Sequence, residues 1–239
     1  MFHTRLNLLI CLFAVIPFLA ACDDGKKEVI TGIDVSEYDA SAELLLDLRD
    51  NKSYKTVTIG KQTWMAQNMN FETANSFCFF ETQENCNAYG RLYTWAAVMD
   101  SAGVYSSNSK GCGYAKSCKA KTPIRGICPR GWHVPTREEF ETLINTVGGD
   151  AIAGKVLKAA KGWDNGGNGT DAFGFSAQAG GERYYFGDFS NQGVVSSLWS
   201  VTEENDAFAY DMYLNADFNN AVIANLSKYS AQSLRCIKN

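Results

Sequence analysis

The sequence predicts an α+β domain that is stabilised by disulfides and built from two or three short helices and short antiparallel strands. Three observations lead to this prediction. Helical hydrophobic patterns lie between residues 89 and 160. Short apolar clusters separated by polar turns lie before residue 66 and after residue 162, and six cysteines follow residue 77. Residues 44–239 are therefore expected to form one domain.

The first 21 residues have the pattern of a cleaved export signal. His3 and Arg5 precede an apolar run over 6–21 that has no charged side chain, whereas spanning a bilayer takes about 20 apolar residues. The run ends in Leu-Ala-Ala-Cys at Cys22, which resembles the bacterial lipobox. The resemblance implies that Cys22 carries acyl chains such as palmitate and begins the mature protein. An ordinary secretory signal with an incidental cysteine is the alternative.

Lipid anchoring predicts a location in the cell envelope, at the outer membrane or the cell surface, with the membrane as a partner. Residues 22–43 are polar and lack periodicity, so we expect a flexible tether there. The chain is 46% hydrophobic with a formal net charge of −4, and its longest basic run is Lys26-Lys27. Because a nucleic-acid surface needs a basic patch, nucleic acid is not an expected partner.

Six cysteines remain after the signal and Cys22, and an even number in an oxidising compartment predicts three disulfides. Six cysteines allow fifteen pairings. Sequence proximity favours Cys78 with Cys86 and Cys112 with Cys118, which leaves Cys128 for Cys236. Zinc sites use cysteines at closer spacing than any here, so no metal site is expected at these thiols.

The domain is expected to begin at Leu44–Leu48. Alternating residues over 54–59 and 62–65 flank Gly60-Lys61, a pattern that predicts a β-hairpin with a two-residue turn. Leu92, Trp95, Ala96 and Met99 recur at helical spacing, and they predict a short amphipathic helix over 89–99. A polar loop is expected over 106–121.

Thr136 and Glu139 have the spacing of a capping box, so a helix is expected from there to Val147, ending at Gly148. A second helix is expected over 151–160. Beyond residue 163 glycine, asparagine and aromatic residues dominate. Short strands are expected at 173–175, 194–195, 198–199, 208–214, 221–226 and 234–237.

Several motifs occur in the order found in the Fibrobacter succinogenes major paralogous domain, which the chain resembles over 47–239. The motifs are Tyr54-Lys-Thr-Val57, Trp64-Met-Ala66, Tyr89-Gly-Arg-Leu-Tyr-Thr-Trp95, Cys128-Pro-Arg-Gly-Trp-His-Val-Pro-Thr136, Gly174-Phe-Ser-Ala177 and Leu234-Arg-Cys236. The resemblance implies a secreted or lipid-anchored surface protein of a family without an established activity.

The stretch from Gly131 to Phe140 also resembles the start of a helix in C-type-lectin-like folds, including formylglycine-generating enzymes. This resemblance implies a lectin-like domain whose first helical region is joined to the last strand by a disulfide. Calcium-dependent lectins carry Glu-Pro-Asn or Gln-Pro-Asp and Trp-Asn-Asp motifs, which are absent, so calcium-dependent sugar binding is not expected. An oxidase would need free thiols, and the favoured pairing leaves none.

The loop over 163–171 offers a candidate ligand site at Trp163, Asp164, Asn168 and Asp171. Its oxygens suit calcium. Consecutive turns are the alternative, which we favour because the loop lacks the ligand spacing of an EF-hand.

Two further groups of polar residues are candidates for catalysis. Glu203, Glu204 and Asp206 form an acidic cluster, but adjacent carboxylates do not define the separation that a glycosidase needs, and a solvated turn is favoured. His133 is the only histidine after the signal, and a structural role is favoured because catalysis needs an oriented partner. No catalytic residue is predicted.

Aromatic residues in the second half provide candidates for stacking on sugar rings. Tyr184, Tyr185 and Trp199 are the main ones, with Phe186 and Phe189 close by in the sequence. Alternation along a strand hides about half of such side chains. We therefore expect a non-catalytic module, without a cofactor, that binds polysaccharide or a surface protein. A structural component of a surface complex is the alternative, and a hydrolase ranks last.

Overall fold

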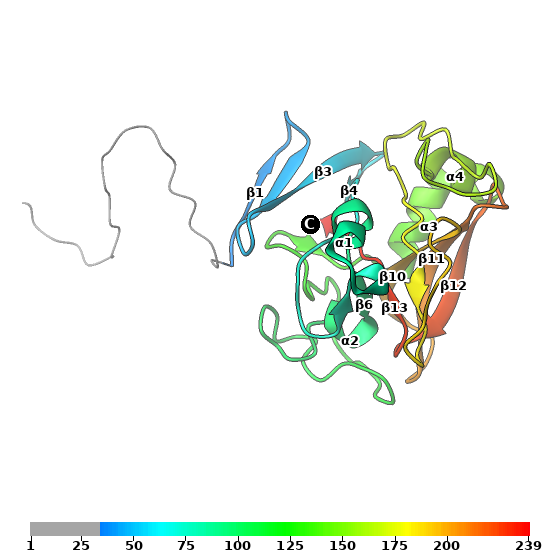
Figure 1. Cartoon of the computed structure of the whole chain (residues 1–239). Coiled ribbons are helices and arrows are strands. Elements are labelled where there is room, and N and C mark those ends of the chain that lie inside the picture. Colours follow the sequence, from blue (N-terminus) through cyan, green and yellow to red (C-terminus); the bar gives the residue numbers. More distant parts are fainter. Residues whose placement is uncertain (1–33) are drawn as a thin grey trace, which may run out of the picture.

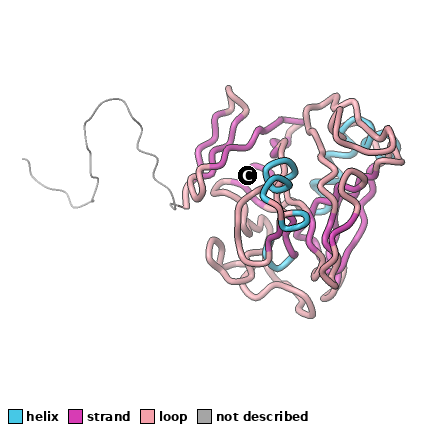
Figure 2. The backbone as a smooth tube through the Cα atoms, in the orientation of Figure 1, coloured by secondary structure: helices cyan, strands magenta, loops and turns pink. Residues whose placement is uncertain are grey.

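Residues 34–239, the part of the chain that the computed structural model describes, fold as an α+β domain of three antiparallel sheets and short helices (Figures 1 and 2). The expected signal and Cys22 lie outside these residues. The helices are α1 (Gln83–Tyr89), α2 (Trp95–Val98), α3 (Arg137–Thr146) and α4 (Asp150–Leu157), with a 3-10 turn, η1, at Phe79–Glu81. Within 34–239 no helix has the length and apolar character needed to cross a membrane.

The first sheet has six strands in the order β1-β2-β3-β4-β14-β7. Their bounds are Ser36–Asp39, Leu44–Asp47, Lys52–Ile59, Gln62–Met65, Ile237–Lys238 and Trp132–His133. The predicted hairpin is confirmed as β3–β4, where Ile59 pairs with Gln62 and Gly60 has a φ of 62°. β1 falls within 22–43, the segment expected to be a flexible tether. Its backbone instead pairs along β2, and Tyr38 packs edge-on against Trp132.

The second sheet has five strands in the order β5-β6-β13-β8-β9. Their bounds are Ser76–Phe77, Leu92–Thr94, Ala231–Gln232, Glu182–Arg183 and Phe189–Ser190. The helix predicted over 89–99 is wrong in its centre, since Leu92–Thr94 is β6 and pairs with β5 and β13. Gly90 ends α1 with a φ of 79°, and Thr94 begins α2 by accepting a hydrogen bond from the backbone of Ala97.

The capping box that the sequence predicts is confirmed at the start of α3. Thr136 Oγ1 accepts a hydrogen bond from Glu139 N, and Glu139 Oε2 accepts one from Thr136 N. α3 ends at Thr146, followed by Gly148 with a φ of 113°. α4 ends earlier than expected, because Lys158 leaves the helix to form a parallel bridge with Ala177.

The third sheet consists of β10 (Val195–Glu203), β11 (Phe208–Asn215) and β12 (Ala221–Ser227), with β11 in the middle. The two strands predicted at 194–195 and 198–199 are thus parts of one strand. The strand predicted at 173–175 is wrong, since this segment turns while Phe175 enters the core 6.0 Å from the Trp64 ring. The segment 234–236 connects β13 to β14 and is not itself a strand.

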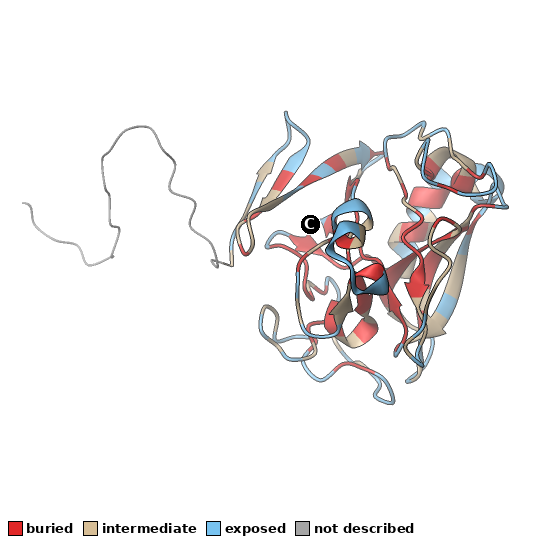
Figure 3. Cartoon of the chain, viewed as in Figure 1, coloured by how far each residue is buried: buried red, intermediate tan, exposed pale blue. Residues whose placement is uncertain are grey.

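The buried residues lie mainly on the strands and helices in the interior of the domain (Figure 3), where they form two large hydrophobic clusters. α3 and α4 cover one face of the third sheet, where Met212 and Leu214 join the core. Phe140 of α3 stacks on Trp64 at a ring distance of 5.3 Å. Because side chains alternate along a strand, Asp211 and Tyr213 of β11 lie on the opposite face of this sheet.

Residues 34–239 contain three disulfides. They join Cys78 to Cys86, Cys112 to Cys118 and Cys128 to Cys236, which is the expected pairing. Cys128 and Cys236 are buried, and their bond ties the loop before β7 to the residue before β14.

Candidate functional site

A polar pocket of about 270 Å³ opens on the face of the third sheet that α3 and α4 leave uncovered. We call it the Asp211 pocket. Figure 1 shows β10 to β13 gathered in this part of the domain, and β13 reaches β10 through a parallel bridge between Ser233 and Leu198. The polar side chains that line the pocket belong to Glu182, Tyr184, Ser197, Asp211, Tyr213 and Gln232.

Strand register explains why these residues meet. Ser197 of β10 lies opposite Tyr213 of β11, and Asp211 lies opposite Ala224 of β12. Residues at such positions share a face of the sheet. Glu182 and Gln232 belong to the second sheet. Gly181, the residue before β8, donates a backbone hydrogen bond to Val195 O of β10 and so holds the two sheets together here.

Several polar atoms of the pocket are buried without a hydrogen-bond partner: Asp211 Oδ1, Ser197 Oγ and Gln232 Oε1. The side chains are well enclosed, since Asp211 is 2% exposed and Gln232 is 1% exposed. Burying an unpaired polar atom costs about 1–3 kcal/mol. The pocket therefore holds buried polar atoms whose hydrogen-bonding capacity is not fully used within the protein.

Burial raises the pKa of Asp211 to about 7. The hydroxyl of Ser197 opposes this shift, the negative charge of Glu182 adds a smaller upward shift, and Gln232 lowers the pKa by less again. Glu182 Oε1 accepts a hydrogen bond from Asn191 Nδ2 at 2.7 Å. The same amide nitrogen lies 3.2 Å from the hydroxyl of Tyr184. Asn191 thus positions both Glu182 and Tyr184, while Asp211 keeps an unpaired oxygen.

Exposed aromatic rings lie beside the pocket and line a hollow of about 490 Å³ that shares Tyr184 and Leu226 with it. We call this group the aromatic rim; it consists of Tyr114, Tyr185, Phe186, Phe208 and Tyr229. Tyr114 and Tyr229 lie 4.2 Å apart between ring centroids, and Tyr185 and Phe186 lie 5.0 Å apart. The rim gives the polar pocket an apolar border.

The turn between β8 and β9 brings two predicted residues, Tyr184 and Tyr185, to this site. Tyr184 N donates to Asp188 O, and Gly187 N donates to Tyr184 O. Gly187 has a φ of 105°, which glycine adopts without the strain of a side chain. The turn therefore holds Tyr184 against the pocket while Tyr185 stays exposed.

Two other predicted aromatic residues are not at the site. Trp199 is fully buried in the core, where its Nε1 donates to Tyr93 O at 2.8 Å. Trp163 is also buried, and its Nε1 donates to Ala177 O at 3.0 Å. Both side chains therefore support the fold, and neither lines the Asp211 pocket or the hollow beside it.

The loop over 163–171 is built of turns whose polar groups bond within the protein. Asn168 Oδ1 accepts from Trp163 N at 3.0 Å, and Asp164 O accepts from Gly167 N at 2.8 Å. Asp171 accepts from the backbone and the hydroxyl of Ser176. Over residues 34–239 no three His, Cys, Asp or Glu side chains gather in a way that suits a metal ion.

The acidic cluster and the histidine have structural contacts. Glu203 Oε1 lies 2.5 Å from the buried Lys228 Nζ, and its carboxylate also accepts from Cys118 N. Glu204 and Asp206 are exposed, as a solvated turn predicts. The two ring nitrogens of His133 both have partners: Nε2 lies 2.9 Å from Glu139 Oε1, and Nδ1 lies 2.7 Å from Asn239 Oδ1.

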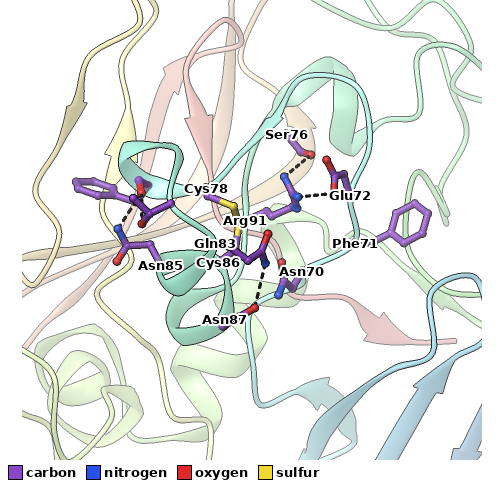
Figure 4. The surroundings of a disulfide bond; sticks show 12 residues. Asn70, Phe71, Glu72, Ser76, Cys78, Gln83, Asn85, Cys86, Asn87 and Arg91 are labelled. Atoms are coloured by element: carbon purple, nitrogen blue, oxygen red, sulfur yellow. Dashed lines mark hydrogen bonds and ion pairs between the residues drawn. A yellow bond between two sulfur atoms is a disulfide. The ribbon is translucent and has the colours of Figure 1, made fainter.

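A second polar hollow, of about 280 Å³, lies beside α1 and the Cys78–Cys86 disulfide. Around this disulfide the charged and amide side chains mostly pair with one another (Figure 4). Arg91 binds Glu72 at 2.7 Å, and Gln83 donates to Asn87 at 3.0 Å. The Asp211 pocket differs because it combines several unpaired buried acceptors with exposed rings.

Sequence reasoning missed the polar residues of the pocket. Asp211 had one usable signal, since it is a single acidic residue inside the apolar run over 208–214, where a buried charge is costly. Glu182 and Gln232 belong to strands of two residues. Such short strands leave no periodicity from which their orientation follows.

Comparison with known proteins identifies the family. Residues 57–238 match the family model described as the Fibrobacter succinogenes major domain. No curated protein and no solved structure matches the chain. The match covers well over half of the 239 residues and includes β4, α3 and the whole third sheet. The chain therefore belongs to the Fibrobacter succinogenes major domain family.

Proposed function

We propose that this protein is a lipid-anchored, non-catalytic surface module that binds polysaccharide through the Asp211 pocket and the aromatic rim. The observation that carries the proposal is the position of unpaired, buried acceptors next to exposed aromatic rings. Sugars present both surfaces that such a site recognises, because they have hydroxyl groups at the ring edge and C–H groups on the ring faces.

The two parts of the site have separate tasks in this proposal. A sugar hydroxyl in the pocket donates to Asp211 Oδ1 or Gln232 Oε1, which removes the cost of leaving these atoms unpaired. A neighbouring sugar stacks on Tyr185 or Phe186, whose rings offer flat apolar surfaces. The pocket lies below the roughly 300–1,000 Å³ typical of drug-sized ligands, which suits one sugar unit of a longer chain.

The anchor and the finer fold class also belong to the proposal. The Leu-Ala-Ala-Cys motif at Cys22 supports lipidation at the outer membrane or the cell surface. The Cys128–Cys236 disulfide ties the region before α3 to the last strand, which supports a C-type-lectin-like domain. In this arrangement the lipid holds the domain close to the material that it binds.

The test uses the full-length chain, purified in detergent, and measures its affinity for soluble mixed-linkage β-glucan, galactomannan, xyloglucan and arabinoxylan. Saturable binding is expected to at least one polymer. Phe186→Ala should weaken it by about 1 kcal/mol, or roughly fivefold in Kd. Phe218→Ala is the matched control, because both rings are 60% exposed and Phe218 lies beyond the far end of β11 from the rim.

Absence of saturable binding to all four polymers would overturn the proposal. If Phe218→Ala lowered the affinity as much as Phe186→Ala, the aromatic rim would not be part of the binding site. Release of reducing sugar from a bound polymer would contradict the non-catalytic part. A protein partner is the second candidate, since exposed aromatic clusters also mark protein interfaces. A partner docked on the rim should tolerate Gln232→Met, which removes the unpaired acceptor Gln232 Oε1 from the pocket, whereas sugar binding should weaken.

A further inference from the structure

We infer that the Asp211 pocket selects a neutral sugar unit and excludes the corresponding uronic acid. This inference rests on the proposed function and adds the class of sugar that the site takes. It follows from the charges around the pocket, which carries two carboxyl groups, from Glu182 and Asp211, and no lysine or arginine among its lining residues.

The cationic side chains that are close in sequence to the pocket residues make their contacts outside the pocket. The Arg183 guanidinium lies 4.2 Å from the centroid of the Phe77 ring and 5.6 Å from that of Phe189, in the second sheet. Lys228 Nζ pairs with Glu203 at 2.5 Å. Neither side chain lines the pocket, so the two carboxyl groups there have no positive partner among its lining residues.

A sugar whose primary alcohol is oxidised would bring another carboxylate into this enclosed space. Like charges repel more strongly inside a protein than in water, because the effective dielectric constant is lower. The unoxidised alcohol has the opposite effect, since it donates a hydrogen bond to Asp211 Oδ1 or Gln232 Oε1. One change at a single carbon of the sugar therefore converts a favourable contact into a repulsive one.

The titratable groups that face Asp211 are few. Glu182 and Tyr184 come from β8 and the turn after it, and Tyr213 comes from β11, whereas β10, β12 and β13 contribute Ser197, Ala224, Leu226 and Gln232. Burial raises the pKa of Asp211 to about 7, since it outweighs the opposing effect of Ser197, and Glu182 adds a smaller upward shift. Acidification below this value protonates Asp211 before an ordinary sugar carboxylate, so discrimination should narrow as the pH falls.

The experiment compares the four neutral polymers with the same polymers after oxidation of their primary alcohols to carboxylates. The full-length chain should bind an oxidised polymer at least tenfold more weakly than its neutral parent. Asp211→Asn and Glu182→Gln should each narrow this ratio. Glu138→Gln removes one negative charge from an exposed position on α3 and is expected to leave the ratio unchanged.

Weaker binding of an oxidised polymer could also come from general repulsion by the net charge of −4. High salt distinguishes this cause from repulsion inside the pocket, since salt screens exposed charges far more than buried ones. A tenfold ratio that persists at about 1 M salt supports the inference. Equal affinity for neutral and oxidised polymers, or a ratio that Glu138→Gln narrows as much as Asp211→Asn, overturns it while sugar binding stands. Failure to bind any neutral or oxidised polymer overturns the proposed function itself.

Discussion

His133 Nε2 lies 2.9 Å from Glu139 Oε1, and this contact joins β7 to the first turn of α3. Burial alone would lower the pKa of His133, but hydrogen bonds to Glu139 and Asn239 and the charge of Glu139 raise it above 6.5. Burial alone would raise the pKa of Glu139, but hydrogen bonds from His133 and Thr136 bring it below 4.5. The two shifts predict how stability depends on pH.

The contribution of this pair to the free energy of unfolding should be largest between about pH 4.5 and 6.5. A raised histidine pKa gives stability that is complete below the unfolded value and is lost as the pH rises through the folded value. A lowered carboxyl pKa gives stability that is complete above the unfolded value and is lost as the pH falls through the folded value. Plotted against pH, stability should therefore fall on an alkaline limb, where His133 loses its proton, and on an acidic limb, where Glu139 gains one. Urea unfolding from about pH 4 to 9 measures both limbs.

His133→Gln should flatten the alkaline limb and lower stability by roughly 1–2 kcal/mol near pH 6, because it removes a charge-assisted hydrogen bond. Glu138→Gln alters the exposed carboxyl next to Glu139 and should keep the limb. An alkaline limb unchanged by His133→Gln would show that another group causes it.

Thr136→Ala should lower the free energy of unfolding by about 1 kcal/mol, because it removes the side-chain cap on Glu139 N at the start of α3. Thr142→Ala is the control on the same helix. Thr142 is exposed and donates only to Glu138 O, so its loss should change stability by less than about 0.5 kcal/mol. Chemical unfolding curves compare them, and equal losses would argue against a specific cap.

These local signals explain which parts of the fold the sequence could predict. The capping box and the Gly60 turn depend on neighbours within a few residues, and both are confirmed. The apolar residues of 89–99 recur at helical spacing, yet Leu92–Thr94 within this segment forms β6, because β5 and β13 pair with its backbone on either side. Since β13 is remote in the sequence, no local pattern contains that information.

The site shows the same division between local and distant information. Tyr185 was predicted from aromatic content alone, and the glycine-assisted turn after β8 does leave it exposed. Trp199 has a similar composition around it, but its strand turns the ring into the core. Asp211, Glu182 and Gln232 meet only when two sheets come together, so the pocket could not be seen before the fold.

Removal of the Cys128–Cys236 disulfide should cost more stability than removal of Cys112–Cys118. The two bonds close loops with sequence separations of 108 and 6 residues. Chain entropy predicts about 5 kcal/mol for the longer loop and about 2 kcal/mol for the shorter one. Paired cysteine-to-alanine variants, compared by urea unfolding, test this order. Equal losses would mean that packing around the sulfurs outweighs loop entropy.

Glu203→Gln should destabilise the domain by roughly 3 kcal/mol at neutral pH. It removes the carboxylate that faces Lys228, whose side chain is 0% exposed, and leaves that ammonium group buried without a counter-charge. Glu204→Gln is the control, since Glu204 is the exposed neighbour in the same acidic cluster. It should have almost no effect on the unfolding curve.

The double variant Glu203→Gln/Lys228→Met removes both members of the pair and should recover part of the stability lost in Glu203→Gln, because no buried charge is left unpaired. A Glu203→Gln variant with the stability of the unmodified chain would contradict a structural role for this carboxylate. If that variant also lost a polysaccharide-cleaving activity that the unmodified chain possesses, the acidic cluster would belong to a hydrolase instead. The unfolding curve and a reducing-sugar assay on the same preparation therefore separate the two roles of Glu203.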